Sequence, residues 1–420
     1  MTPTARLDEL RVDGDRLARE LDALAGFSDA PAPAVTRVVF GETDRKAREY
    51  VTSLCAEASL AVRTDAVGNT FARWRGTSPE LPAVATGSHI DAIPNAGRFD
   101  GTVGVLGGLE AIRALQRAGC TPRRSIELIL FTSEEPTRFG IGCLGSRLLS
   151  GALDPAVDDT LRDADQGTLK ERRTAAGFSG ALARVRLSEG SYSAFVELHI
   201  EQGPLLEAGR LDIGVVTAIA APASLRIHIE GQGGHAGAVL MPDRHDAFLA
   251  GAEIALAVEA AARASGSIDT VGTVGVCNVF PGAVNSVPSR TTLEVDVRDI
   301  ERTRRDDVLS TILGASQAIA ARRAVTVRVD TLNADPPATC APEIVDAVMS
   351  ACQAHAVSHR TMISRAYHDS LFMARVAPTG MIFIPCRGGV SHRPDEYASP
   401  EAIANGTAVL ARTLATLAST

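Results

Sequence analysis

Residues 82–91 read PAVATGSHID, and this stretch indicates the class of fold. Pro82–Ser88 is a short, uncharged run that predicts a buried β-strand, and a histidine follows it directly. Downstream, the sequence predicts a helix over Val103–Ala118, a second buried strand over Ile126–Thr132 and a third over Ala194–Ile200. This alternation predicts an α/β domain with a largely parallel or mixed sheet.

A different pattern begins near Thr217, because Ser224–Glu230 alternates apolar and polar residues as a half-buried strand does. The segments expected after it are a helix at 246–263, strands at 270–280 and 291–299, a helix at 302–321 and a strand at 324–329. The order β-α-β-β-α-β is that of a ferredoxin-like α+β domain. We therefore predict one α/β domain, residues 1–216 and 330–420, interrupted by an inserted α+β domain at 217–329. Residues 155–191 are polar and weakly periodic, so we expect them to lie outside the core.

The composition argues against several classes of function. The 420 residues include 42 basic and 50 acidic side chains, a formal net charge of −8, which does not suit a protein that binds nucleic acid. Aromatic residues make up 4% of the chain, too few for a platform on which bases stack. The longest uncharged run, Thr270–Ser289, is broken by glycines and prolines, so we expect no membrane span and no membrane partner. The seven cysteines never form a CxxC pair, which predicts reduced thiols in a cytoplasmic protein.

Side chains that can bind metals fall at or just beyond the carboxyl ends of the predicted strands, the edge at which α/β sheets bind ligands. They are His89, Asp100, Glu134, Glu135, His199 and His392. Singly, each has an ordinary explanation, because a lone histidine is usually a solvated loop residue and a Glu-Glu pair usually begins a helix. Together, imidazoles and carboxylates suit divalent zinc, manganese, nickel or iron, and an aspartate between two such sets can bridge two ions. Asp91 is placed to hydrogen-bond the His89 imidazole and fix its tautomer.

Several motifs together make a resemblance plain. They are Gly87-Ser88-His89-Ile90-Asp91, Phe99-Asp100-Gly101, Glu134-Glu135, His199-Ile200-Glu201-Gln202-Gly203-Pro204 and Gly234-His235-Ala236-Gly237. The chain resembles the M20-type binuclear metal amidohydrolases, in the hydantoinase and carbamoylase branch, over nearly its whole length. The resemblance implies a metallopeptidase-like catalytic α/β domain whose inserted domain serves as a lid and dimerisation domain.

The resemblance also implies roles for individual residues. His89, Asp100 and His199 would hold one divalent ion, and Asp100, Glu135 and His392 a second, with manganese expected and zinc as the alternative. Glu134 matches the general base of the family. Gln202, His235, Asn285 and Arg298 match its substrate-binding positions, and His235 would also donate a hydrogen bond to the developing oxyanion. Some of these residues would complete the active site of a partner subunit, which implies a homodimer.

The residues themselves suggest plainer roles for part of this set. Arg298 is expected to pair with Asp296 or Asp299 on a strand surface, and Asn285 is expected to be a turn residue. Relatives that act on carbamoyl amino acids commonly read Gly-Ala-Gly-His-Asp where this chain has Arg365-Ala366-Tyr367-His368-Asp369. Tyr367 would add bulk and a hydroxyl at the substrate, which favours a small polar molecule, and His368 is expected behind the metal ligands.

The implied activity is hydrolysis of the ureido C–N bond of a small ureido acid. Ureidoglycolate is the expected substrate, and glyoxylate, ammonia and carbon dioxide are the expected products, as in purine catabolism. The alternatives are an N-carbamoyl-L-amino acid hydrolase and an allantoate amidohydrolase, which keep the chemistry and change the substrate. A metal-free dimeric binding protein is a further hypothesis, and the presence of every expected ligand and of Glu134 argues against it.

Overall fold

The computed structural model describes residue 7 and residues 9–419, which form two compact units. The first unit contains the chain up to Thr217, Cys340–Ser364 and the chain from His368 onward, and the second contains Ala218–Thr339 and Arg365–Tyr367. Residues 1–6, 8 and 420, which belong to the predicted catalytic domain, lie outside the described residues. The second unit extends past residue 329 because its last strand continues to Ala334.

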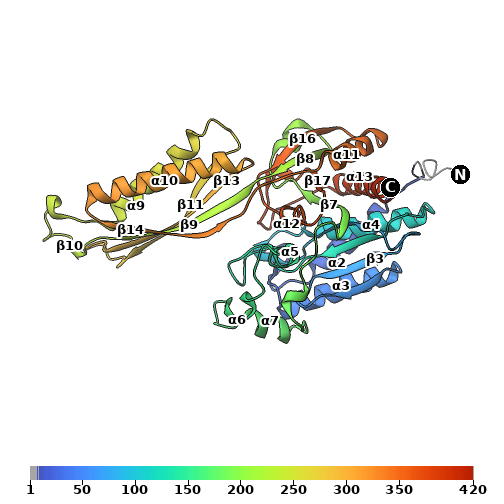
Figure 1. Cartoon of the computed structure of the whole chain (residues 1–420), viewed down its shortest axis with the longest axis horizontal. Coiled ribbons are helices and arrows are strands. Elements are labelled where there is room, and N and C mark those ends of the chain that lie inside the picture. Colours follow the sequence, from blue (N-terminus) through green and yellow to red (C-terminus); the bar gives the residue numbers. More distant parts are fainter. Residues whose placement is uncertain (1–6, 8, 420) are drawn as a thin grey trace. The chain divides into compact units, whose positions relative to one another are not determined.

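The main sheet has nine strands in the order β15-β8-β17-β7-β4-β6-β3-β2, with β16 paired to β8. Figure 1 labels β8, β17 and β7, which are neighbours in this sheet. The central strands β17, β7, β4 and β6 run parallel, and the strands that flank them are antiparallel. The strands are β2 (Ala61–Thr64), β3 (Thr70–Trp74), β4 (Ala83–Ser88), β6 (Ile126–Leu130), β7 (Tyr192–Ile200), β8 (Ile213–Ile219), β15 (Ala338–Thr339), β16 (His359–Ser364) and β17 (Thr379–Ile384). The predicted α/β fold with a mixed sheet is confirmed.

Helices cover both faces of this sheet because its central strands alternate apolar side chains between two cores. Val84 and Leu198 pack into the core that contains α4 (Thr102–Arg117) and α13 (Pro400–Ala418). Phe195 packs on the opposite side, with the residues of α5 (Leu144–Ser150). Further elements of the first unit are α2 (Gly14–Ala25), α3 (Glu42–Glu57), α8 (Leu205–Gly209), α11 (Pro342–Ala354), α12 (Asp369–Met373) and the strand pair β1 (Val35–Arg37) and β5 (Ala92–Ala96).

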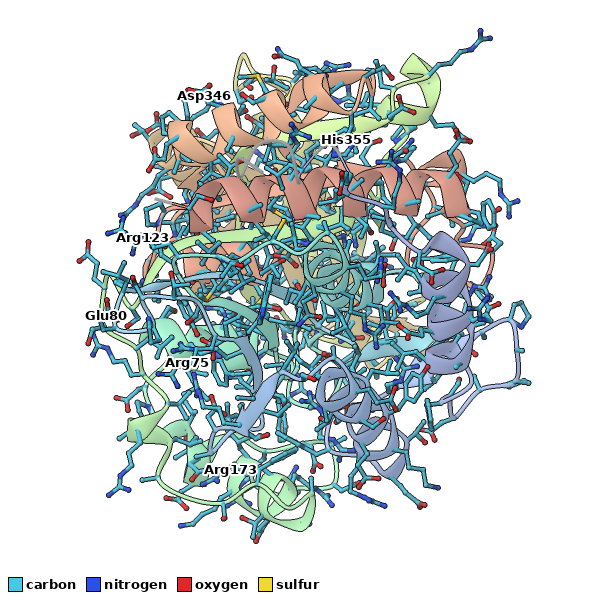
Figure 2. All side chains as sticks on the ribbon, turned by 90° about the vertical axis from the view of Figure 1, so that its right-hand side faces the viewer. Arg75, Glu80, Arg123, Arg173, Asp346 and His355 are labelled. Atoms are coloured by element: carbon cyan, nitrogen blue, oxygen red, sulfur yellow. The ribbon has the colours of Figure 1, made fainter. Side chains whose placement is uncertain are left out.

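The expectation that residues 155–191 lie outside the core is wrong in part. The segment forms α6 (Val157–Thr160), α7 (Leu169–Ala175) and a 3-10 turn at Leu182–Arg184. Leu169 and Leu182 are buried in the core that contains α5. Arg173 of α7, labelled in Figure 2, is 3% exposed and donates to both carboxylate oxygens of Asp158. These buried residues do not form a periodic pattern in the sequence. Hydrophobic periodicity alone therefore does not predict that the segment packs against the core.

The second unit runs in the order β9 (Ala221–Glu230), α9 (Ala247–Arg263), β11 (Val271–Phe280), β13 (Arg290–Asp299), α10 (Arg302–Arg323) and β14 (Thr326–Ala334). Its four main strands form an antiparallel sheet in the order β11-β13-β9-β14. Both helices lie on one face of this sheet (Figure 1). Ile227, Ile254 and Val295 share the buried core of this unit. The predicted ferredoxin-like βαββαβ plan is confirmed.

A small antiparallel pair, β10 (Gly234–His235) with β12 (Ser286–Val287), lies beyond the end of this sheet at which Glu230 of β9 pairs with Arg290 of β13. The backbone N–H of Gly231 continues this pairing by donating to the carbonyl of Ser289. Among the described residues, no helix has both the length and the apolar character that crossing a membrane requires.

Candidate active site

The five predicted metal ligands lie at the carboxyl-terminal edge of the parallel strands. His89 directly follows β4, His199 is the second-last residue of β7, and Glu135 lies in the loop after β6. Asp100 lies just before α4, and His392 follows β17 and the 3-10 turn Arg387–Gly389. Parallel strands bring their carboxyl ends to one edge, so residues far apart in the sequence meet there.

Asp100 joins these ligands into two groups. Its Oδ1 lies 3.5 Å from Nε2 of His89 and 3.2 Å from Nε2 of His199. Its Oδ2 lies 3.5 Å from Nε2 of His392, which is itself 3.2 Å from Oε1 of Glu135. Within each group the ligand atoms lie within 4.8 Å of one another. The two oxygens of Asp100 therefore face different groups, as those of a bridging carboxylate do.

The two buried histidines present their Nε2 atoms to Asp100. Nδ1 of His89 lies 3.0 Å from the backbone oxygen of Asp91, and Nδ1 of His199 lies 2.9 Å from that of Ile200. Each Nδ1 therefore carries a proton and donates it to a carbonyl, which turns Nε2 toward Asp100. Gly101, at a φ of +66°, keeps the space open, because a Cβ there would stand 2.5 Å from Nε2 of His89. This donor set and this space fit divalent metal ions.

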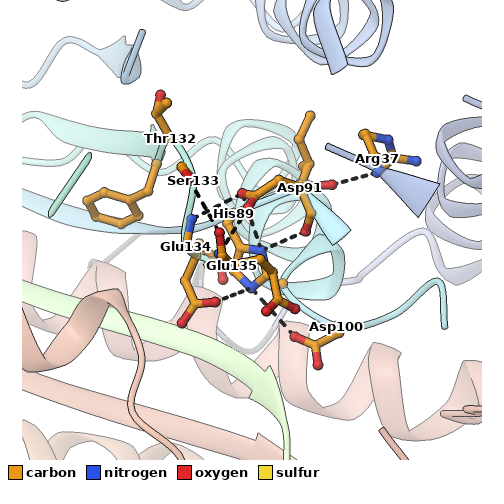
Figure 3. Close-up of polar contacts among 12 residues, drawn as sticks. Arg37, His89, Asp91, Asp100, Thr132, Ser133, Glu134 and Glu135 are labelled. Atoms are coloured by element: carbon orange, nitrogen blue, oxygen red, sulfur yellow. Dashed lines mark hydrogen bonds and ion pairs between the residues drawn. The ribbon is translucent and has the colours of Figure 1, made fainter. Parts of the chain in front are cut away.

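The bond that orients His89 comes from the backbone carbonyl of Asp91 and not, as expected, from its carboxylate. Oδ1 of Asp91 lies 3.7 Å from Nδ1 of His89. The carboxylate instead accepts hydrogen bonds from the backbone N–H groups of Glu134 at 3.2 Å and Glu135 at 3.0 Å (Figure 3). Burial raises the pKa of Asp91 to about 6. Asp91 thus ties the end of β4 to the loop that carries both glutamates.

Crowded carboxylates set the charge of the cluster. Burial alone lowers the pKa of His89, but the negative charges of Glu134, Asp100 and Asp91 outweigh it and raise the pKa well above its ordinary value. The hydrogen bond with Glu135 raises the pKa of His392 to about 9. The cluster therefore attracts positive charge, which is carried by protons on the histidines or by bound cations.

Glu134 is held from two sides. Its Oε2 lies 3.7 Å from Nε2 of His89, and its Oε1 accepts a hydrogen bond from Sγ of Cys143 at 3.4 Å. The backbone N–H of Cys143 also donates to the carbonyl of Glu134 at 2.7 Å. Burial raises the pKa of the Cys143 thiol well above its ordinary value, so the thiol keeps its proton and donates it. Nothing in the sequence distinguishes this cysteine from the other scattered thiols.

Strained backbone gathers around these residues. Ser133, Cys143, Gln202 and His392 all adopt left-handed conformations, with φ of +57°, +55°, +56° and +59°. Each such conformation costs a non-glycine residue about 1–3 kcal/mol, and such residues cluster at functional sites because the surrounding structure holds them there. The strain is therefore consistent with a site selected for function.

Three polar side chains support Asp100. Nε2 of Gln202, a predicted substrate contact, donates to Oδ2 of Asp100 at 2.6 Å. Oγ of Ser391 lies 2.6 Å from the same oxygen and 2.9 Å from Oε2 of Glu396. Oε1 of Glu396 accepts hydrogen bonds from the backbone N–H groups of Phe99 at 2.8 Å and Asp100 at 3.1 Å. Sequence reasoning missed Ser391 and Glu396, whose only signal is that they lie close in the chain to a predicted ligand.

A buried polar layer lies beside His199. The ring of His368 lies 4.5 Å from the ring of His199, centroid to centroid, and its Nε2 lies 3.1 Å from Oγ of Ser364. Glu197, His199 and His368 also have the spacing of a metal group. The carboxylate of Glu197 is already engaged, however, by the hydroxyls of Ser88 at 2.7 Å and Ser370 at 2.6 Å. The structure therefore places His368 next to a predicted ligand, within a hydrogen-bonded layer.

The predicted substrate contacts that lie in the second unit form two neighbouring pairs: His235 with Asn285, and Arg298 with Tyr367. His235 and Asn285 are exposed and neighbours, because β10 pairs with β12 and the N–H of Ala236 donates to the carbonyl of Asn285 at 2.8 Å. Arg298 lies in β13, and its Nε donates to Oδ1 of Asp296 at 2.8 Å, the ion pair that its neighbours in the sequence suggest. The guanidinium of Arg298 also lies 5.7 Å from the ring centroid of Tyr367.

Known proteins resemble this chain over nearly its whole length. The family model described as Peptidase family M20/M25/M40 matches residues 85–416. Ureidoglycolate hydrolase of Arabidopsis thaliana is 56% identical over 415 residues, which cover 97% of this chain and 87% of that protein. N-carbamoyl-L-amino acid amidohydrolase of Geobacillus stearothermophilus is 37% identical over 408 residues, which cover 97% of this chain and 99% of that protein.

The fold agrees with these similarities. The crystal structure of AtUAH in complex with (S)-hydroxyglycine matches with a TM-score of 0.91 and 55% identity, covering 98% of this chain and 99% of that chain. Sequence and fold therefore confirm the predicted M20-type resemblance. The chain belongs to peptidase family M20/M25/M40.

Proposed function

We propose that this chain is a metal-dependent amidohydrolase that hydrolyses the ureido C–N bond of ureidoglycolate. One observation carries the proposal: a chain 56% identical to a ureidoglycolate hydrolase also holds two ligand groups joined by Asp100, with Glu134 beside them. The 37% identical carbamoylase supports hydrolysis of the same kind of bond in a different substrate.

The proposed cofactors are two divalent ions. His89, Asp100 and His199 would hold one ion and Asp100, Glu135 and His392 the other, and such ions polarise a carbonyl and lower the pKa of water. Manganese is the expected metal. Zinc binds imidazole and carboxylate ligands more tightly than manganese does, so it competes for the same groups.

Glu134 is the proposed general base. Its Oε2 faces the first ligand group, while its Oε1 is engaged by Cys143. Oε2 takes a proton from the attacking water as the water oxygen bonds to the ureido carbon, and the proton passes to the terminal nitrogen as the C–N bond breaks. Burial raises the pKa of Glu134 well above its ordinary value, which suits a carboxylate that must accept a proton. His235 donates a hydrogen bond to the carbonyl oxygen as negative charge develops there.

The products follow from this bond cleavage. The terminal nitrogen leaves as ammonia, and the remaining carbamate loses carbon dioxide to give 2-hydroxyglycine. This compound breaks down to glyoxylate and a second ammonia. The similar protein AtUAH has been crystallised in complex with (S)-hydroxyglycine and with glyoxylate, which supports this order of products.

Arg298 and Asn285 are the proposed contacts of the substrate carboxylate, with Gln202 as a further substrate contact. A guanidinium offers a planar fork of N–H donors that matches a carboxylate, and the amide of Asn285 can add a further donor. Tyr367, whose ring lies beside Arg298, would narrow the pocket and offer a hydroxyl to a small polar substrate.

A homodimer is part of the proposal because one chain cannot bring these contacts to one small molecule. Arg298 pairs with Pro222 near one end of β13, and Arg290 pairs with Glu230 at the other end. At about 3.4 Å per residue, the eight residues from Arg290 to Arg298 span about 27 Å. His235 lies beyond the Arg290 end, so it would reach a substrate held by Arg298 only from a second subunit.

The second unit also has a surface suited to such a partner. Among the described strands of its main sheet, β11 pairs only with β13 and leaves one edge open. Val271 on β11 is 38% exposed, and Phe248 and Leu256 on α9 are 41% and 67% exposed. Open strand edges and exposed apolar patches are typical of protein interfaces.

A cytoplasmic location is the last part of the proposal. All seven cysteines are thiols in the structure, and none takes part in a disulfide. Thiols of this kind are typical of proteins in a reducing compartment.

The deciding experiment compares three substrates with one manganese-loaded preparation. Ammonia release is measured from ureidoglycolate, an N-carbamoyl-L-amino acid and allantoate. We expect ureidoglycolate to have the highest kcat/KM by at least about tenfold, because Tyr367 would narrow the pocket and offer a hydroxyl, which favours a small polar substrate. A higher kcat/KM for either other substrate would contradict the proposed substrate.

Glu134→Gln is the matched control for contaminating activity. We expect it to lower kcat by about 10²–10⁴ and to leave the bound manganese unchanged, because Glu134 is in neither ligand group. Near-normal turnover in this variant would refute the role of Glu134 as the base.

A further inference from the structure

Glu396 is 4% exposed and lies against the loop that carries Asp100. Its Oε1 accepts hydrogen bonds from two successive backbone N–H groups, those of Phe99 at 2.8 Å and Asp100 at 3.1 Å. Gly97 permits this approach, because a Cβ there would stand 2.3 Å from the Cβ of Glu396. The loop therefore wraps around the carboxylate, and its backbone cannot shift without breaking both bonds.

The second oxygen of Glu396 reaches the side chain of Asp100 through a serine. Oε2 of Glu396 lies 2.9 Å from Oγ of Ser391, and the same Oγ lies 2.6 Å from Oδ2 of Asp100. Ser391 directly precedes His392, a ligand of the second group. Glu396 thus joins the two loops that supply Asp100 and His392.

The contacts of Glu396 and Ser391 act on the orientation of the Asp100 carboxylate. Its Oδ1 lies 3.2 Å from His199 and its Oδ2 lies 3.5 Å from His392, so the plane of the carboxylate determines whether each group receives one oxygen. An unsupported aspartate rotates about its terminal torsion over a broad range. The contacts of Glu396 and Ser391 restrict both the backbone and the carboxylate plane.

We propose that Glu396 is a positioning residue that holds Asp100 in its bridging orientation, so that the two metal groups form together on one shared ligand. The inference rests on the metal centre of the proposed function and extends it to a residue outside the ligand set. Removing a hydrogen-bonding partner of a metal ligand typically weakens metal binding by about 10–100-fold. Because Asp100 belongs to both groups, the loss should appear for both ions.

The test measures manganese binding directly, without reference to turnover. The full-length chain is stripped of metal with a chelator and titrated with Mn²⁺ by calorimetry. In Glu396→Ala we expect both dissociation constants to rise by about 10–100-fold. In Glu396→Gln we expect them to stay within about threefold, because the amide oxygen still accepts the two backbone N–H groups.

Ser391→Ala removes the link to the Asp100 side chain and leaves the backbone bonds of Glu396 in place. We expect a loss of manganese affinity smaller than that in Glu396→Ala. The double variant should bind manganese as weakly as Glu396→Ala does, because the two residues act in one chain of contacts. Asp212→Asn is the matched control, since Asp212 likewise accepts hydrogen bonds from a backbone N–H and a serine hydroxyl, both of Ser358. Its manganese affinity should equal that of the unmodified chain.

Unchanged affinity in Glu396→Ala would overturn the inference, and so would an equal loss in Asp212→Asn. If Glu396→Ala does not fold, Ser391→Ala decides the question: a loss of affinity supports the inference, and an unchanged affinity overturns it. If the unmodified chain itself binds no manganese, the metal centre of the proposed function is refuted, and the inference falls with it.

Discussion

Arg298 and His235 lie far apart within the second unit, and this separation makes a specific prediction about mixed dimers. Glu134→Gln removes the proposed base, and His235→Ala removes the proposed donor to the oxyanion. Each variant alone should be nearly inactive, because a general base contributes about 10²–10⁴ in rate and an oxyanion donor about 10²–10³. The two changes lie in different units of the chain, so mixing the variants tests which subunit each residue serves.

The amount of activity that mixing the two variants should restore follows from the symmetry of a dimer. If His235 serves the partner's active site, a mixed dimer has one site with both defects and one site with none. Equal amounts of the two variants re-pair to give half mixed dimers, so about one quarter of the unmodified activity should return. If His235 served its own chain, every site would carry one defect and no activity would return.

The assay is ammonia release from ureidoglycolate after the two variants have exchanged subunits. Co-expression with two different tags, followed by purification on both, isolates the mixed dimer and should yield about half of the unmodified activity. The control pairs Glu134→Gln with His89→Ala, both in the first unit, and this mixture should stay inactive. Activity no greater than the sum of the separate variants would refute the argument from the length of β13.

Three further predictions follow from individual contacts. Arg298→Ala should raise the KM for ureidoglycolate by about 10–100-fold with little change in kcat, because a charge-assisted bond to the carboxylate is lost; an unchanged KM would count against this contact. Cys143→Ala should lower kcat about tenfold at unchanged manganese content, because Glu134 loses its second support. Cys352→Ala, at an equally buried thiol, should affect thermal stability alone, and equal effects on kcat in the two variants would argue against the role of Cys143. The hydrogen bond from Arg323 lowers the pKa of Glu253 from 4.5 to about 2, so Glu253 stabilises the chain above pH 4.5 and loses this effect as the pH falls toward 2. Glu253→Gln should flatten that part of the stability profile in urea unfolding, and an unaltered profile would contradict the ion pair.

The regular parts of the fold could be predicted from the sequence because their patterns are local. The apolar run Pro82–Ser88 corresponds to β4 at Ala83–Ser88, and the expected helix at 246–263 corresponds to α9 at Ala247–Arg263. The order of strands and helices after Thr217 was sufficient to predict a ferredoxin-like domain. Residues 155–191 show the limit of this approach, since the segment is anchored by isolated buried residues and not by a repeating face.

The positions of the candidate site residues were predictable where a residue lies at a strand end, and less predictable where the position depends on the path of a loop. His89 and His199 are recognisable because parallel strands present their carboxyl ends at one edge. Cys143 and Glu396 have no such signal, because their partners, Glu134 and Asp100, are brought to them by loops that fold back on the sheet. For Asp91, the sequence predicted the position near His89 but not the contacts. Its carboxylate accepts a hydrogen bond from the loop that carries Glu134, and its backbone carbonyl accepts the one from His89.

The amino-acid sequence was enough to predict the α/β class, the inserted βαββαβ domain and, with the family resemblance, the set of residues expected to bind metal. Periodicity and residue type suffice for these, since both are properties of neighbouring positions. The tertiary structure was needed to show that Asp100 presents one oxygen to each predicted ligand group, that Glu396 contacts the Asp100 loop, and that His235 lies beyond the end of the sheet opposite to Arg298. These facts depend on strand order, register and loop path, which place residues that are distant in the chain within bonding distance or keep them apart.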